Sequence, residues 1–178
     1  MNKFIALFGA VCLTACANVN VSDDFTVEKS FSYQLPSVPD GGVIPPYMET
    51  LTQSTPVDVS NVISKLNSLG TPSFTVYSMT IDANMGLGFV THVEVDITQS
   101  NGQYLVVCNT DAPTSGLRVL FLPVIASGND LLTYLGSGQV ILSVSLTVST
   151  ASGEIPSGEL DLNYYLGLNA NESVSKSL

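Results

Sequence analysis

The chain has 178 residues, and fifteen Asp and Glu against five Lys and Arg give it a formal net charge of −10. So acidic a chain excludes nucleic-acid binding, which depends on clustered Lys and Arg, and disfavours contact between the protein surface and anionic lipid. Charged residues are only 11% of the sequence, against about 25% in a typical soluble domain. Low charge with abundant Ser, Thr and Gly is typical of extracytoplasmic all-β domains.

The first residues have the layout of a secretory signal peptide. Met1-Asn2-Lys3 is a positively charged start, and Phe4–Leu13 is an apolar run of about ten residues, too short to span a bilayer. Leu13-Thr14-Ala15-Cys16 follows and resembles the lipobox of bacterial lipoproteins. The resemblance implies that residues 1–15 are removed as a signal peptide. It also implies that Cys16 becomes the mature N-terminus and carries lipid: a diacylglyceryl group on its sulfur and often an acyl chain, such as palmitate, on its amine.

The lipid on Cys16 predicts anchoring in the bacterial cell envelope, because two or three acyl chains hold a protein stably in a membrane. In this family the residue after the lipidated cysteine directs sorting, and Ala17 in place of Asp implies the outer membrane. Two alternatives stay open: a cleaved signal with an unmodified cysteine, or an N-terminal core strand. Cys12 would leave with the signal, so Cys108 would be the only other cysteine and no intrachain disulfide could form.

Three parts are predicted after the signal peptide: a tether over 16–24, a folded domain over 25–170 and a flexible tail over 171–178. The domain begins with alternating apolar and polar residues over 25–35, which predicts a strand with one buried face.

A proline-rich segment, residues 36–56, is predicted to be a long irregular loop. After it, residues 58–70 place Val, Ile and Leu at helical spacing and end in Gly, which predicts one short helix lying on a sheet. A second short helix of one or two turns is predicted over 129–136.

Strands dominate the rest of the chain. Residues 116–128 form a nearly continuous apolar run, as expected of a strand covered on both sides. The strands after the loop are predicted at 73–83, 88–98, 103–110, 116–128, 138–149 and 158–170. About seven strands, one or two short helices and no βαβ alternation predict an all-β fold, an antiparallel β-sandwich.

The dipeptide Asn101-Gly102 predicts a tight hairpin between two of these strands, because a two-residue type I′ turn needs positive φ at both of its residues. This turn sets the pairing of the two strands, with Gln99 opposite Tyr104, Ile97 opposite Val106 and Val95 opposite Cys108. The pairing predicts that Cys108 faces the core as a small, unreactive thiol.

His92, Glu94 and Asp96 are the strongest candidates for metal ligands. They alternate along one strand and therefore share a face, and an imidazole with two carboxylates is a plausible ligand set. Same-face positions are about 7 Å apart, however, so one ion is not easily reached by all three without a bulge. The competing interpretation is the solvent face of a half-buried strand, which alternation alone predicts.

No catalytic motif is present in the sequence. There is no G-x-S-x-G elbow, no H-E-x-x-H and no phosphate-binding glycine loop, and His92 is the only histidine. We therefore expect no cofactor and a non-catalytic binding or structural module, held to the membrane by the lipid on Cys16, whose partner is an envelope protein or a glycan. The alternatives are a carrier of an apolar or lipid ligand and a carboxylate-based hydrolase that would use Glu94 or Asp96.

Overall fold

The computed structural model describes residues 17–36, 47–61, 63–64, 73–112, 116–136, 138–152 and 154–176. These residues contain eight strands and the helix α2. In chain order the elements are β1 (Ala17–Gln34), β2 (Met48–Asp58), β3 (Ser73–Ala83), β4 (Val90–Gln99), β5 (Tyr104–Asp111), β6 (Val119–Phe121), α2 (Gly128–Leu135), β7 (Gln139–Ser149) and β8 (Glu159–Lys176).

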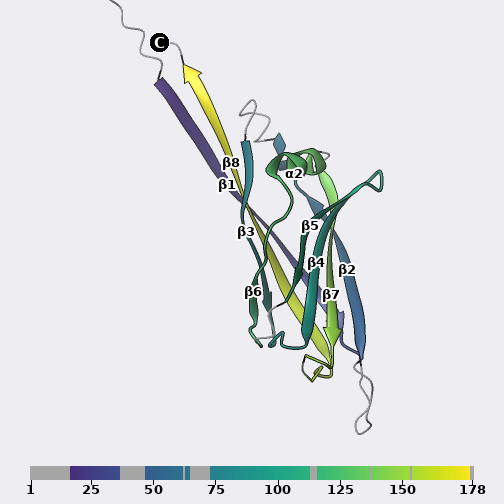
Figure 1. Cartoon of the computed structure of the whole chain (residues 1–178). Helices are drawn as coiled ribbons and strands as arrows, with labels where there is room; N and C mark the ends of the chain where they lie inside the picture. The colour runs from purple at the N-terminus through teal and green to yellow at the C-terminus, as the bar shows by residue number, and fades with distance from the viewer. Residues whose placement is uncertain are drawn as a thin grey trace, which may run out of the picture.

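The strands form two four-stranded antiparallel sheets. Sheet A has the order β1-β8-β3-β6 and sheet B the order β2-β7-β4-β5. The two sheets face each other, and α2 lies across one end of them (Figure 1). The predicted all-β sandwich is therefore confirmed.

Alternation of apolar and polar residues builds the core between the sheets. Along β8, Leu160, Leu162, Tyr164, Leu166 and Leu168 are all buried, and alternate residues of β7 face them from sheet B. Alternate residues of a strand point to opposite faces, so each strand adds one row of side chains to the core.

One buried hydrogen bond crosses between the sheets. The hydroxyl of Tyr33 on β1 donates to the carbonyl of Val144 on β7 at 2.8 Å. Burial raises the pKa of Tyr33 because the charged phenolate would lose its hydration. The pairing satisfies a polar group that would otherwise be costly in an apolar core.

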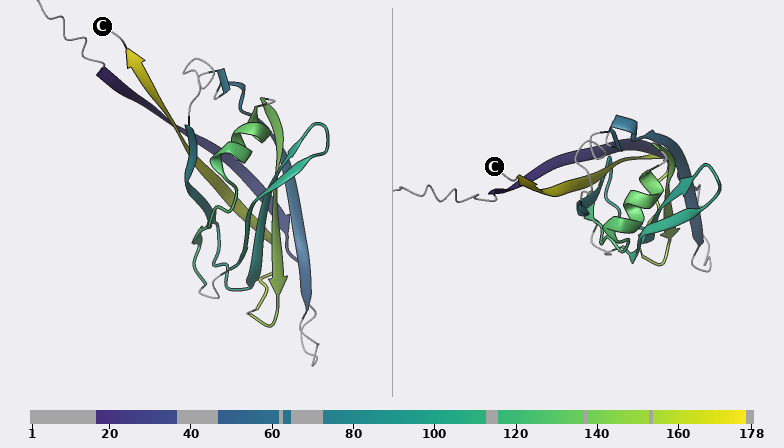
Figure 2. Two further views of the ribbon diagram at one scale, coloured as in Figure 1. Left: turned by 45° about the horizontal axis from the view of Figure 1, so that its top comes forward. Right: turned by 90° about the horizontal axis from the view of Figure 1, so that it is seen from above.

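The tether predicted over 16–24 and the flexible tail predicted over 171–178 are corrected, because residues 17–24 belong to β1 and residues 171–176 to β8. β1 starts at Ala17 and pairs with β8 without interruption, from Ala17 opposite Lys176 to Gln34 opposite Glu159. Each segment supplies the backbone partners that the other needs. β3 pairs with β8 only as far as Asn171, so the start of β1 and the end of β8 form a two-stranded ribbon that projects from the sandwich (Figures 1 and 2). Residues 1–16, which include Cys16, lie outside the described residues.

The predicted loop over 36–56 is also corrected, because its second part is β2, which pairs with β7. Pro56 lies in β2 at the edge of sheet B, where the absence of an N–H group is tolerated. Residues 37–46 lie outside the described part. Of the helix predicted over 58–70, residues 60, 61, 63 and 64 are helical and 65–70 are not described. The predicted second helix is confirmed as α2.

The hairpin between β4 and β5 has a three-residue loop, not the predicted two-residue turn. Gly102 donates its N–H to the Gln99 carbonyl at 2.9 Å, and Gln99 donates to the Gln103 carbonyl at 2.8 Å. Gly102 has φ +83°, whereas no described non-glycine residue has positive φ. This is a type I turn followed by a left-handed glycine. The predicted pairs of Gln99 with Tyr104 and Ile97 with Val106 are therefore wrong by one residue.

A β-bulge in β5 restores the predicted pairing further along. Asp96 pairs with Val106 but the next residue, Val95, pairs with Cys108, so Val107 has no opposite residue. The prediction of Val95 opposite Cys108 is thus confirmed, by two irregularities that cancel. As a result the neighbours Val107 and Cys108 are both buried.

Candidate functional site

The three candidate metal ligands lie on the outer face of sheet B, and each is paired with a different neighbour. The His92 Nδ1 lies 3.0 Å from an Asp111 carboxylate oxygen across the β4–β5 pair. Glu94 accepts a 2.6 Å hydrogen bond from the Asn109 side chain. Asp96 accepts one from the Thr98 hydroxyl at 3.2 Å. The described residues contain no group of three His, Cys, Asp or Glu that could hold a metal ion.

Hydroxyl pairs continue these rows onto the neighbouring strands. Thr50 and Thr147 lie 3.1 Å apart, oxygen to oxygen, and the corresponding distances are 2.9 Å for Thr52 and Ser145 and 3.0 Å for Ser54 and Ser143. Strand pairing places the three pairs beside His92, Glu94 and Asp96 respectively. Burial raises the pKa of Asp96, and hydrogen bonds from Thr98 and Ser143 oppose that rise. This face is therefore a flat, mutually hydrogen-bonded polar surface.

Cys108 faces the core, as predicted, and its side chain is 0% exposed. Burial, with a smaller contribution from the negative charge of Glu94, raises the pKa of the Cys108 thiol to about 11. The thiolate is the reactive form of cysteine, so this thiol has little nucleophilic character at neutral pH.

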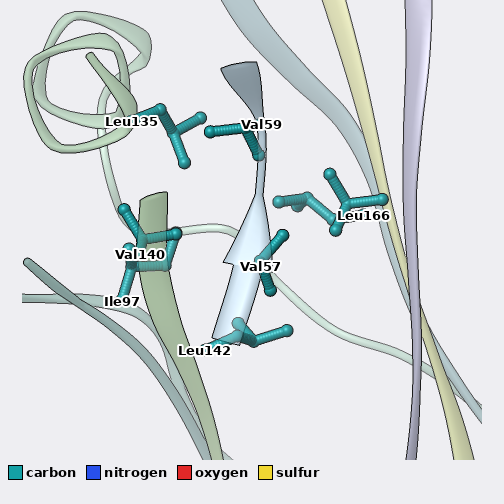
Figure 3. Close-up of a pocket in the computed structure, with 8 residues that line it drawn as sticks. Val57, Val59, Ile97, Leu135, Val140, Leu142 and Leu166 are labelled. Atoms are coloured by element: carbon teal, nitrogen blue, oxygen red, sulfur yellow. The ribbon is translucent and has the colours of Figure 1, made fainter. Parts of the chain in front are cut away.

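A small apolar cavity lies between the sheets beneath α2 (Figure 3). Its volume is about 10 Å³, and it is lined by Val27, Val57, Val59, Ile97, Leu135, Val140, Leu142 and Leu166. A cavity of this size has room for about one water molecule, whereas pockets for small organic ligands are about 300–1,000 Å³. The space is a packing gap in the core.

A row of exposed apolar side chains lies along the segment that contains β6. Phe121 is 82% exposed, and the other members of this apolar row are Leu117 at 56%, Val119 at 39% and Ile125 at 58%. The intervening Leu120 and Leu122 are buried. The prediction that residues 116–128 form a strand covered on both sides is therefore wrong. Only Val119–Phe121 is strand, at the edge of sheet A, and its outward residues are uncovered.

The outer face of sheet A, to which Val119 and Phe121 belong, is acidic. Asp82 on β3 lies directly opposite Val119, and Thr80 lies opposite Phe121. In the described part of β1, β8, β3 and β6, the outward positions include no Lys or Arg. Their acids are Asp24, Glu28, Asp82, Glu159 and Asp161.

No protein-family model matches the sequence, and no curated protein matches it. Among solved structures, the chain is similar, at a TM-score of 0.21, to one titled Desmodium yellow mottle tymovirus, with 8% identical residues over 99% of this chain and 92% of that chain. A likeness this weak carries no argument. Within the described residues, no helix has the length and apolar character needed to cross a membrane.

Proposed function

We propose that this protein is a lipid-anchored, non-catalytic binding module of the bacterial cell envelope. The observation that carries the proposal is the apolar row at the edge of sheet A, whose central residue, Phe121, is 82% exposed. A phenylalanine side chain offers about 150–250 Å² of apolar surface. Contiguous apolar surface of a few hundred Å² on a folded domain marks a site of interaction with another molecule.

The position of Ala17 supports the proposal that the protein is anchored through Cys16. Ala17, the residue after the proposed lipidated Cys16, lies at the free tip of the β1–β8 ribbon (Figures 1 and 2). A lipid at this tip would hold the sandwich by two paired strands, which project from the end of the body where α2 lies (Figure 1). Ala17 after the cysteine supports outer-membrane sorting within the same proposal.

The interior favours a binding surface over a carrier. An acyl chain needs an apolar cavity of several hundred Å³, whereas the apolar cavity between the sheets holds about 10 Å³, and a larger hollow of about 300 Å³ is lined in part by the polar residues Lys29, Asp58 and Gln139. A hydrolase that uses Glu94 or Asp96 is disfavoured because the side chains of Asn109 and Thr98 already hydrogen-bond these carboxylates.

Site-specific crosslinking in intact cells tests the binding surface. A photoreactive phenylalanine analogue at position 121 should form adducts of increased mass. The same analogue at position 52, an exposed site on the outer face of sheet B, is the matched control. Equal adducts at both positions, or none at position 121, would contradict the proposal.

Membrane fractionation tests the anchor. Wild-type protein should be in the membrane fraction, and Cys16→Ala should leave it and migrate differently on a gel. An unchanged distribution and mobility would refute lipidation at Cys16.

A further inference from the structure

The apolar row differs from the other outward surfaces of the sandwich in chemistry. On sheet B, three outward residues of β2 and three of β7 are hydroxyls that pair with one another, and the exposed apolar residues Met48 and Ile141 lie at opposite ends of these strands. On β6, the outward residues are Val119 and Phe121. A single apolar side chain on a protein surface needs no explanation, but Leu117, Val119 and Phe121 are exposed at alternating positions of one segment, and Ile125 follows them where the chain reaches β5.

The electrostatic surroundings of this surface are negative. Across the strands of sheet A, Phe121 lies opposite Thr80, Thr80 lies opposite Tyr165, and Tyr165 lies opposite Glu28. Burial raises the pKa of the Tyr165 hydroxyl, and the negative charges of Glu28 and Asp82 raise it further. Glu28 and Asp82 thus lie on the same outer face as Thr80 and Phe121.

Asp82 is the acid nearest to the row and is free to pair. It is exposed and lies opposite Val119. Within the described part of the chain, its carboxylate makes no hydrogen bond or ion pair. Asp161, by contrast, accepts hydrogen bonds from Ser32 and Asn84. Asp82 could therefore pair with a cationic side chain without first breaking a hydrogen bond or ion pair within the described part of the chain.

The charge of the chain argues against two other occupants of the row. A second copy of the chain also carries a formal charge of −10, so two such faces would repel each other. An anionic membrane surface would be repelled by the same acids. Arg118, exposed beside Val119 in the chain, is one positive charge against the five acids of the outer face of sheet A.

We propose that the apolar row binds a cationic polypeptide segment, whose apolar side chains contact Val119 and Phe121 and whose Lys or Arg residues pair with Asp82 and the acids beyond it. The inference rests on the proposed binding function and adds the chemistry of the partner. Contact with Phe121 supplies most of the affinity because it removes the most apolar surface from water. The acids supply selectivity for positive charge and speed the encounter.

Peptide binding to the full chain in a nonionic detergent tests this inference. The probe is a fluorescent peptide in which Lys and Leu alternate, followed by anisotropy. A peptide with Glu in place of every Lys is the matched control for charge, and detergent alone is the blank. We expect the Lys–Leu peptide to bind at least about tenfold more tightly than the Glu–Leu peptide. Equal affinities would overturn the inference.

Variants locate the binding surface. Phe121→Ser should weaken binding of the Lys–Leu peptide about tenfold to a hundredfold, the loss expected for one buried aromatic contact. Asp82→Asn should weaken it about twofold to fivefold, with the difference lost at high salt. Ile141→Ser removes an apolar residue, 43% exposed, from the other sheet and should leave binding unchanged. An unchanged affinity in Phe121→Ser, or an equal loss in Ile141→Ser, would overturn the inference.

Two further measurements separate the possible failures. Light scattering should show one copy per particle, and a dimer that Phe121→Ser dissociates would overturn the inference in favour of self-association. Thermal unfolding of each variant confirms that it is folded. If crosslinks form at position 121 in cells but the Lys–Leu peptide does not bind, the chemistry of the partner is wrong while the binding function stands. If both experiments are negative, both proposals fall.

Discussion

Two neighbouring residues of β5, Val107 and Cys108, are both buried, which an unbroken strand does not allow because its side chains alternate between faces. The β-bulge at Val107 accounts for this. It predicts that a cysteine at either position is protected from thiol reagents. We therefore propose to compare the wild type with the double variant Cys108→Ala, Val107→Cys.

The expected protection follows from the environment of the thiol. At pH 8 an ordinary cysteine, with a pKa of about 8.5, is about one quarter thiolate. With a pKa of about 11, Cys108 is about one thousandth thiolate at that pH. Labelling should therefore be slowed at least about two hundredfold by ionisation alone, and further by lack of access because the side chain is 0% exposed.

The assay is labelling by a maleimide, followed by mass spectrometry in native buffer and in denaturant. Both thiols should react slowly in the native protein and rapidly after unfolding. Val106→Cys in the Cys108→Ala background is the matched control, because Val106 is only partly buried and should react faster. Regular alternation would place Val106 on the core face with Cys108 and Val107 on the outer face, so a Val107→Cys variant that reacts as fast as Val106→Cys, or faster, would refute the bulge.

The same raised pKa makes stability depend on pH. The folded protein keeps the Cys108 proton up to about pH 11, whereas the unfolded chain releases it near pH 8.5. The contribution of this group to the free energy of unfolding is therefore fully present below about pH 8.5 and is lost as the pH rises towards 11. Cys108→Ala should cost about 1 kcal/mol at pH 7 through the small cavity it leaves, and less at pH 10. A constant difference between pH 7 and pH 10 would contradict the assigned burial.

Three further predictions concern stability and are measured by chemical denaturation. Tyr33→Phe should cost about 1–2 kcal/mol, because it removes a buried hydrogen bond. Tyr164→Phe should be neutral or stabilising, because the Tyr164 hydroxyl is buried and has no hydrogen-bond partner among the described residues; equal losses would contradict this assignment. Both Gly102 and Gly138 have positive φ, and Gly102→Ala should cost roughly 1 kcal/mol. Gly138→Ala should cost more, because a Cβ there would lie 2.9 Å from a serine oxygen; a smaller loss than in Gly102→Ala would contradict this contact. Asp111→Asn should cost less than about 1 kcal/mol despite its pairing with the histidine of β4, because its side chain is 95% exposed; a loss above about 2 kcal/mol would show a larger role for this pair.

The sandwich was predictable because the strands that build its core carry their pattern locally. Residues 138–149 and 158–170 alternate so regularly that both the strand and its buried face follow from sequence, and β7 and β8 confirm them. The pairing of β1 with the end of β8 was not predictable in this way. It joins Ala17 to Lys176, and no pattern within either segment shows that the other is its partner.

The hairpin shows how a correct local signal can lead to a wrong register. Asn101-Gly102 does mark the turn, but a glycine with positive φ suits both a two-residue loop and a three-residue loop. The two loops differ by one residue in pairing. The bulge at Val107 shifts the pairing back by one residue, so that Val95 lies opposite Cys108 as predicted. The burial of Cys108 was therefore predicted correctly from a partly wrong pairing.

The prediction of a strand covered on both faces over residues 116–128 was wrong because apolar composition does not determine which faces of a strand are covered. A strand covered on both faces and an edge strand with an uncovered apolar face have the same sequence pattern. In this fold, α2 buries Leu131 and Leu135 at one end of the sandwich and lies away from the outer face of sheet A (Figure 2). Nothing in the described chain covers Phe121.

Strand formation alone does not require this apolar surface. Threonine has a high strand propensity, and the chain uses Thr and Ser at outward positions of β2 and β7, where their hydroxyls pair. The same choice at positions 119 and 121 would keep β6 in the sheet and place polar atoms in water. Val119 and Phe121 instead expose apolar surface beside the unpaired carboxylate of Asp82. Contact of Val119 and Phe121 with the proposed partner would account for this exposed apolar surface.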